Sequence, residues 1–139
     1  MDWKQHAKLL FNVPKPAHFT RYWHCCECAE HDNTLTTADA DSIGLPQLGN
    51  PGWDPLCFAS VEGLVYYMPA LIRLTLETMD TPQERYLDQL LFHLIRDGKD
   101  NDLVRACSPE QRGYIASFLA HVMETYSAQI DEGSYSHAC

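Results

Sequence analysis

The chain has 139 residues, of which 45% are hydrophobic, and it carries a formal net charge of −9. A chain of this length and composition can bury a core as one domain without crosslinks. The charge argues against DNA or RNA as a partner, because nucleic-acid binding needs a basic surface and the lysines and arginines here are scattered.

No segment has the features of a membrane span or a signal peptide. The longest apolar stretch, Leu64 to Leu76, is interrupted by Pro69 and Arg73 and is too short to cross a bilayer. The N-terminus has no apolar run behind a basic start. We therefore expect a cytoplasmic protein, in which the six cysteines are free thiols or metal ligands rather than three disulfides.

Two short helices are expected in the N-terminal part of the chain. Apolar residues recur on one side of the stretch from Asp2 to Phe11, and two prolines follow it. A second helix of about three turns is expected from Thr20 to His31. On this helix His24, Cys28 and His31 would share one face at the i, i+4, i+7 spacing.

Residues 33–57 are rich in Thr, Asp, Gly and Pro and predict a long ordered loop. One short helix from Asp39 to Ile43 is expected within it. Because long loops without structure are unusual in compact domains, we expect Trp53, Leu56 and Phe58 to hold this loop against the core.

Three long amphipathic helices are expected in the second half. The first follows Ser60, a good N-cap, and contains Pro69, which should bend it. The second begins at Thr81-Pro82 and is closed by Gly98. The third follows Ser108-Pro109-Glu110-Gln111, which matches a capping box with proline at the first helical position.

These elements predict an all-α fold: a small helical bundle of three long helices, with one or two short N-terminal helices and a long ordered loop. The whole chain, residues 1–139, is expected to form one helical domain. Residues 1–57 would hold the N-terminal helices and the loop, residues 58–131 the helical core, and residues 132–139 a flexible tail.

Three parts of the sequence resemble an uncharacterised bacterial family of unknown function. They are Cys25-x-Glu27-Cys28, Tyr66-Tyr67-Met68-Pro69-Ala70 on a central helix, and Ser108-Pro109-Glu110-Gln111 before the last helix. The likeness runs in order along most of the chain. It implies a compact, mainly helical bacterial domain, and it implies no particular reaction or ligand.

The segment from His24 to His31 gathers three of the six cysteines and two of the seven histidines within eight residues. Cys25 and Cys28 form a Cys-x-x-Cys pair, which is the commonest half of a zinc site. The candidate ligands for zinc are therefore Cys25, Cys28, His31 and His24. One short segment cannot easily direct all four side chains at one ion, so a ligand from a distant element is also sought among His18, Cys57, His93 and Cys107. The acidic side chains that could orient the ligands are those of Glu27, Glu30 and Asp32.

Two other interpretations of this segment stay open. In a redox site, a Cys-x-x-Cys pair at a helix start has a lowered thiol pKa, although the neighbouring Glu27 and Glu30 oppose this effect. In a purely structural role, Cys25 or Cys28 is a small buried apolar group and the histidines lie at the surface or are satisfied in the core.

The chain contains no complete catalytic motif and no glycine-rich phosphate loop. The favoured function is a non-catalytic interaction or regulatory domain with an unknown protein partner, either with or without a structural zinc ion. The alternative is a metal-dependent or thiol-dependent enzyme that uses Cys25, Cys28 and His31, with Glu27 or Glu30 as the acid/base.

Overall fold

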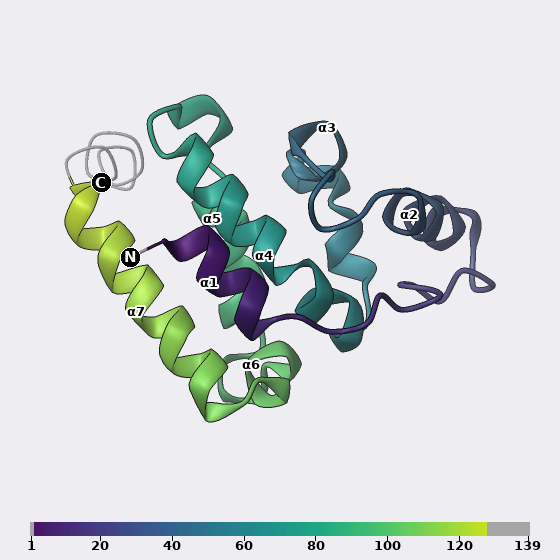
Figure 1. Cartoon of the computed structure of the whole chain (residues 1–139). Helices are drawn as coiled ribbons and strands as arrows, with labels where there is room; N and C mark the ends of the chain where they lie inside the picture. The colour runs from purple at the N-terminus through teal and green to yellow at the C-terminus, as the bar shows by residue number, and fades with distance from the viewer. Residues whose placement is uncertain (1, 128–139) are drawn as a thin grey trace.

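The computed structural model describes residues 2–127, and every regular element in this range is helical (Figure 1). The α-helices are α1 (Trp3–Leu10), α2 (Cys26–Thr37), α3 (Leu45–Leu48), α4 (Val61–Thr78), α5 (Leu87–Ile95), α6 (Asp102–Ala106) and α7 (Pro109–Thr125). Short 3-10 helices are η1 (Pro51–Trp53), η2 (Pro55–Phe58), η3 (Pro82–Glu84) and η4 (Gly98–Asp100). The all-α prediction is confirmed for the described residues, and the predicted tail at 132–139 lies outside them.

Helix α4 is the centre of the fold. Helices α1, α5 and α6 pack against it, and α7 packs against α1 (Figure 1). As expected, Ser60 caps α4: its hydroxyl oxygen accepts a hydrogen bond from the backbone N–H of Gly63 at 3.1 Å. Helix α4 runs through Pro69 without interruption and buries a largely apolar face. None of the described helices is both long and apolar enough to cross a membrane.

Two of the three helices expected to be long are long, since α4 has 18 residues and α7 has 17. The middle one is shorter than predicted. Pro82 starts the 3-10 helix η3, and α5 begins only at Leu87 and has 9 residues. Thr81 makes no cap hydrogen bond, and the N–H of Tyr86, the residue before α5, donates to the buried hydroxyl of Thr78 at the end of α4.

Helix α5 also ends earlier than Gly98. Arg96 leaves the helical conformation, and Asp97 adopts a left-handed one with φ of 64°. The side-chain amide of Asn101 donates to the carbonyl oxygens of His93 and Arg96, both at 2.9 Å. Because these carbonyls have no partner within the helix, Asn101 satisfies the end of α5.

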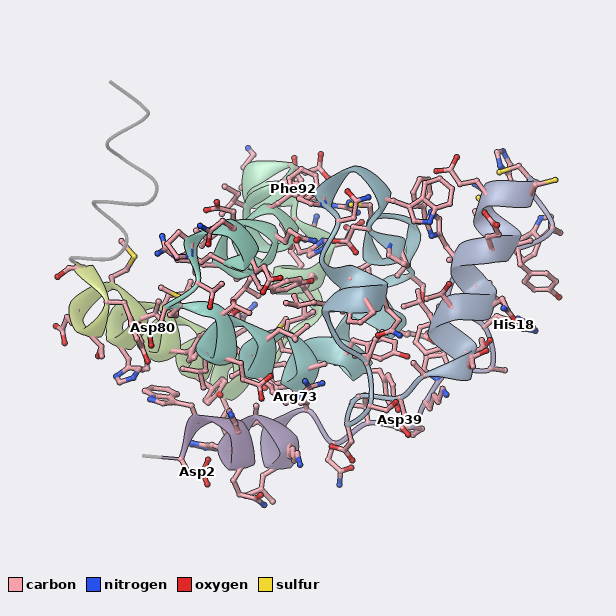
Figure 2. All side chains as sticks on the ribbon, turned by 90° about the horizontal axis from the view of Figure 1, so that it is seen from above. Asp2, His18, Asp39, Arg73, Asp80 and Phe92 are labelled. Carbon is pink, nitrogen blue, oxygen red and sulfur yellow. The ribbon has the colours of Figure 1, made fainter. Side chains whose placement is uncertain are left out.

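The first N-terminal helix is confirmed, with Asp2 as its N-cap. The second helix is displaced towards the C-terminus: α2 runs from Cys26 to Thr37 rather than from Thr20 to His31. The hydroxyl of Tyr67 donates to the carbonyls of Leu35 and Ala38, so the central helix satisfies the end of α2. Figure 2 shows α2 and the neighbouring His18 at one end of the molecule, far from Asp2.

The loop prediction is correct only in part. The expected helix from Asp39 to Ile43 is a turn, because a side-chain oxygen of Asp39 accepts hydrogen bonds from the N–H groups of Asp41 and Ser42. Leu56 is fully buried, as expected. Trp53 and Phe58 remain more than two-fifths exposed and pack against α2.

Candidate metal and thiol site

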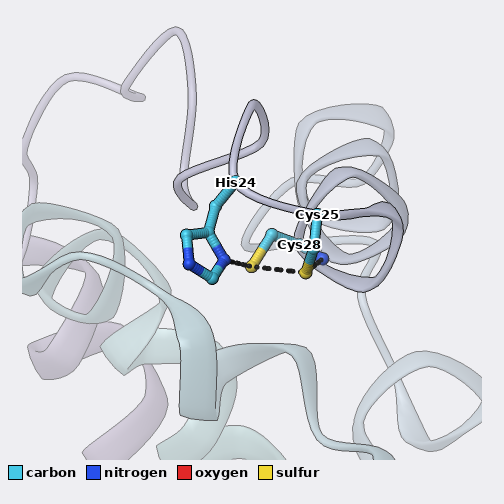
Figure 3. Close-up of side chains that lie close together, drawn as sticks. All are labelled: His24, Cys25 and Cys28. Atoms are coloured by element: carbon cyan, nitrogen blue, oxygen red, sulfur yellow. Dashed lines mark hydrogen bonds between the residues drawn. The ribbon is translucent and has the colours of Figure 1, made fainter.

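Three of the four predicted ligands converge at the N-terminal end of α2 (Figure 3). The Sγ atoms of Cys25 and Cys28 lie 3.4 Å apart, and Nδ1 of His24 lies 3.9 Å from Sγ of Cys28. In Figure 3 the Cys28 sulfur lies between the imidazole and the Cys25 sulfur. One ligand atom from each residue lies within 4.8 Å of both others.

The start of α2 positions the two thiols. Cys25 is the N-cap in an extended conformation, and its Sγ accepts a hydrogen bond from the N–H of Cys28 at 3.4 Å. Cys28 lies one turn into the helix, so the three-residue spacing places both sulfurs on one side. A turn closed by the His24 N–H and the Arg21 carbonyl brings the imidazole back to the same side.

The spacing of these atoms suits a tetrahedral ion. Zinc–sulfur bonds of about 2.3 Å and zinc–nitrogen bonds of about 2.0 Å give ligand separations of about 3.5 to 3.8 Å. The separations of 3.4 Å and 3.9 Å require only small side-chain rotations to match. Within residues 2–127, no fourth His, Cys, Asp or Glu side chain joins the group. Because His24 and Cys25 are exposed, the fourth coordination position would face solvent.

The helix start also sets the pKa values of the two thiols. The backbone N–H of Cys28 and hydrogen bonds from His24 and Cys28 lower the pKa of Cys25 to about 7. The pKa of Cys28 is raised, first by its hydrogen bond with Cys25 and then by burial. Cys25 is therefore partly thiolate at neutral pH, the form that binds metals and attacks disulfides. Glu27, expected to oppose this effect, instead helps to lower the pKa of Cys25 through a hydrogen bond from its backbone N–H.

His31, the remaining predicted ligand, does not join the group. Its side chain is fully buried, with ring centroids 4.5 Å from Trp53 and 4.7 Å from Phe58. Its Nε2 lies 3.7 Å from a carboxylate oxygen of Glu27, which is too long for a hydrogen bond, and neither ring nitrogen has a hydrogen-bond partner in the described part of the chain. His24 and Cys28 meet as predicted, but the His31 imidazole packs on Trp53 and Phe58 instead and does not join them.

Asp32, expected to orient the ligands, holds the segment that leads to them. One carboxylate oxygen accepts from the N–H groups of Phe19 at 2.6 Å and Thr20 at 3.1 Å, and the other lies 2.8 Å from Nδ1 of His18. Burial raises the pKa of this carboxyl, but the hydrogen bonds from His18, Phe19 and Thr20 together outweigh it and lower the pKa. Glu30, the other acidic residue expected in this role, is exposed.

None of the distant ligand candidates reaches this group. His18 pairs with Asp32, and Cys107 is buried in the apolar core. Cys57 and His93 gather instead with Asp54, which the sequence analysis did not select as a ligand. The sequence contains one local signal at Asp54: an aspartate followed by proline is typical of a helix start. No local pattern links Asp54 to His93.

The chain matches no protein-family model, no curated protein and no solved structure at a significant level. The resemblance to a bacterial family therefore stays a prediction, and the function is argued from the geometry of the site.

Proposed function

We propose that this protein is a non-catalytic interaction or regulatory domain that binds one zinc ion through His24, Cys25 and Cys28. The convergence of two thiols and one imidazole within 4.8 Å carries the proposal, because these are the ligands that zinc prefers. The pKa of about 7 at Cys25 allows this ligand to lose its proton near neutral pH. A bound ion would fasten the segment before α2 to the helix.

The surroundings of the site favour an interaction role over catalysis. A catalytic zinc ion holds water at an open position inside a water-excluding cavity. Here His24 and Cys25 are exposed, and the neighbouring Trp23 is 70% exposed. Exposed aromatic rings are typical of protein interfaces. A partner side chain would complete the coordination of the ion.

The charge of the chain narrows the class of partner. A net charge of −9 favours a protein with a basic surface and disfavours nucleic acid. We further propose that the domain works in the cytoplasm, where thiols stay reduced.

Metal analysis of tag-free protein tests the zinc site. We expect one zinc ion per chain, with X-ray absorption showing two sulfur ligands, one imidazole and one lighter ligand. Cys25→Ser and Cys28→Ser should each lose the ion. Cys26→Ser is the matched control, because Cys26 is an exposed neighbour outside the group and its variant should keep the ion. A metal-free protein, or equal loss in all three variants, would contradict the proposal.

Capture from a native lysate tests the interaction role. The zinc-loaded protein is compared with the Cys25→Ser, Cys28→Ser double variant as bait. A basic protein retained by the first and lost with the second is the expected result. Equal recovery with both baits, or recovery of small molecules alone, would count against a zinc-dependent interaction.

A second candidate function, thiol–disulfide exchange, is favoured by the opposite pKa shifts of Cys25 and Cys28. The Cys25 thiolate would attack a disulfide of the substrate, form a mixed disulfide and release one substrate thiol. Cys28, 3.4 Å away, would then lose its proton and attack the Cys25 sulfur. This step forms the Cys25–Cys28 disulfide and releases the second substrate thiol.

Equilibration of metal-free protein with glutathione buffers separates the two candidates. A reversible Cys25–Cys28 disulfide in protein purified without zinc would favour exchange. Stoichiometric zinc that protects both thiols from glutathione disulfide would favour the interaction domain.

A further inference from the structure

A second group of potential metal ligands lies inside the molecule, where α5 faces the loop before α4. Asp54 and His93 are 3% and 1% exposed, and Cys57 is partly buried beside them. A carboxylate oxygen of Asp54 lies 2.9 Å from Nε2 of His93. One ligand atom from each of the three residues lies within 4.8 Å of both others.

Neighbouring groups hold the carboxylate of Asp54 in place. Oδ1 accepts a hydrogen bond from the N–H of Leu56 at 2.9 Å. The amide of Gln89 donates to Oδ2 at 3.1 Å and to the carbonyl of Leu48 at 2.6 Å. Oδ2 is thereby directed at His93. Hydrogen bonds of this kind orient the ligands of metal sites.

Within residues 2–127, two buried polar atoms beside this group have no hydrogen-bond partner. They are Nδ1 of His93 and the hydroxyl of Tyr86. Tyr86 is fully buried, and its pKa is raised well above the usual value, first by burial and then by the charges of Asp54 and Cys57. Buried polar atoms are almost always paired, so this region is not complete as a purely structural network.

A small cavity gives access to the group. Its volume is about 210 Å³, which is ample for an ion and a coordinated water molecule. The lining residues are Pro51, Asp54, Cys57, Asp88, Gln89 and Phe92. Two of the three potential ligands thus face a space that an ion can enter.

We infer that Asp54, Cys57 and His93 form a second metal site, independent of the zinc site proposed above, for a borderline divalent cation such as Zn²⁺ or Co²⁺. A carboxylate, a thiolate and an imidazole suit this class of ion. Binding replaces the Asp54–His93 hydrogen bond with two bonds to the metal. The His93 proton moves from Nε2 to the unpartnered Nδ1, and the Cys57 thiol proton leaves to solvent, so affinity rises with pH.

The same residue types also occur in thiol nucleophile sites, but the geometry and charge here disfavour that role. Burial and then the charge of Asp54 raise the pKa of Cys57. An activated thiol requires a lowered pKa and an unoccupied base beside it. Nε2 of His93 is instead directed at Asp54.

Cobalt binding by the full-length chain tests this site. The Cys25→Ser, Cys28→Ser background removes the surface site, so failure of the zinc proposal does not affect the result. We expect one Co²⁺ per chain and a thiolate-to-cobalt absorption band that strengthens as the pH is raised. Asp54→Asn keeps a side-chain oxygen that can accept the hydrogen bond from the N–H of Leu56. It should weaken Co²⁺ binding by about tenfold or more.

Cys57→Ser should abolish the band, whereas the control Cys107→Ser should keep it, because Cys107 is a buried thiol outside the group. Protection of Cys57 from alkylation by Co²⁺ in the background protein gives a second measurement that needs no further variant. No stoichiometric band and no protection would overturn the inference, as would a band that survives Cys57→Ser.

Discussion

Cys25 shows how a few hydrogen bonds change the chemistry of an exposed side chain. Its sulfur lies at the first turn of α2, where the N–H of Cys28 has no partner within the helix. That N–H, the imidazole of His24 and the Cys28 thiol all favour the thiolate, so the pKa falls to about 7. Cys26, the next residue, is also exposed but lies outside this arrangement.

Replacing His24 with alanine tests this account at the residue scale. The change removes one of the hydrogen bonds that lower the pKa of Cys25, so we expect that pKa to rise above about 7. The pH dependence of iodoacetamide alkylation at Cys25 in metal-free protein measures it. Cys26→Ser should leave the profile unchanged. An identical profile in His24→Ala would show that the imidazole has no part in setting this pKa.

At the scale of elements, the position of α2 depends on the segment before it and on α4. The N–H of Ser60 donates to the carbonyl of Phe19 at 2.7 Å, so this segment is hydrogen-bonded to the start of α4. Phe19 is 1% exposed, and its ring lies over Gly63. A methyl group at Gly63 would come within 2.6 Å of that ring. Glycine in this helical position therefore allows the close packing of Phe19.

Gly63→Ala and Gly113→Ala form a matched pair that tests this contact. Both glycines lie inside α-helices, but an added methyl group at Gly113 would have no atom of residues 2–127 within 4 Å apart from its chain neighbours and the backbone of its own helix. Gly113→Ala should stabilise the protein by up to about 1 kcal/mol, because alanine favours the helix. Gly63→Ala should destabilise it by about 1–2 kcal/mol, because the overpacking cost exceeds that gain. Urea unfolding measures both, and equal effects would contradict the packing role of Phe19.

Within the molecule, residues 18–37, which comprise α2 and the segment before it, form an arm. This arm lies beside a helical body that consists of α1, α4, α5, α6 and α7 (Figures 1 and 2). The hydroxyl of Tyr67 and the ammonium of Lys15 bind carbonyls at the C-terminal end of α2, and His31 packs it against Trp53 and Phe58. Asp32 joins the leading segment to α2. The proposed zinc ligands His24, Cys25 and Cys28 therefore lie at the end of this arm.

Acid should first weaken the hydrogen bonds that hold the segment before α2, because they depend on the carboxylate of Asp32. The lowered pKa of Asp32 means that its stabilising effect is fully present above the unfolded value of about 3.9 and is lost as the pH falls through the lower folded value. At pH 7, Asp32→Ala should reduce the free energy of unfolding by about 2–4 kcal/mol, because it removes charged hydrogen bonds to two buried N–H groups.

Denaturant unfolding at pH 7 and near pH 2 measures the difference between wild type and Asp32→Ala, which should shrink in acid. Asp39→Ala is the control, since Asp39 also has a lowered pKa but is exposed and caps only a turn. Its effect should be below about 1 kcal/mol. A constant difference across this pH range would contradict the role given to the Asp32 carboxylate.

Features that depend on neighbouring residues could be predicted from the sequence. Helical periodicity, the caps at Ser60 and Ser108, and the Cys25–Cys28 spacing act within one or two turns, so they were predictable. The same short range explains why the pair of thiols in the candidate site was found. Helix propensity did not predict that α5 is short. The residue before this helix, Tyr86, is hydrogen-bonded through its N–H to the hydroxyl of Thr78 in α4, a contact that propensity does not describe.

The contacts of the isolated histidines and aspartates depend instead on how the helices pack together. His31 is buried by rings from another segment, Asp32 binds backbone groups 12 and 13 residues away, and Asp54 meets His93 across 39 residues. These pairings arise when helices pack together and bury side chains that must then find partners. Local spacing carries no information about which distant group that partner is.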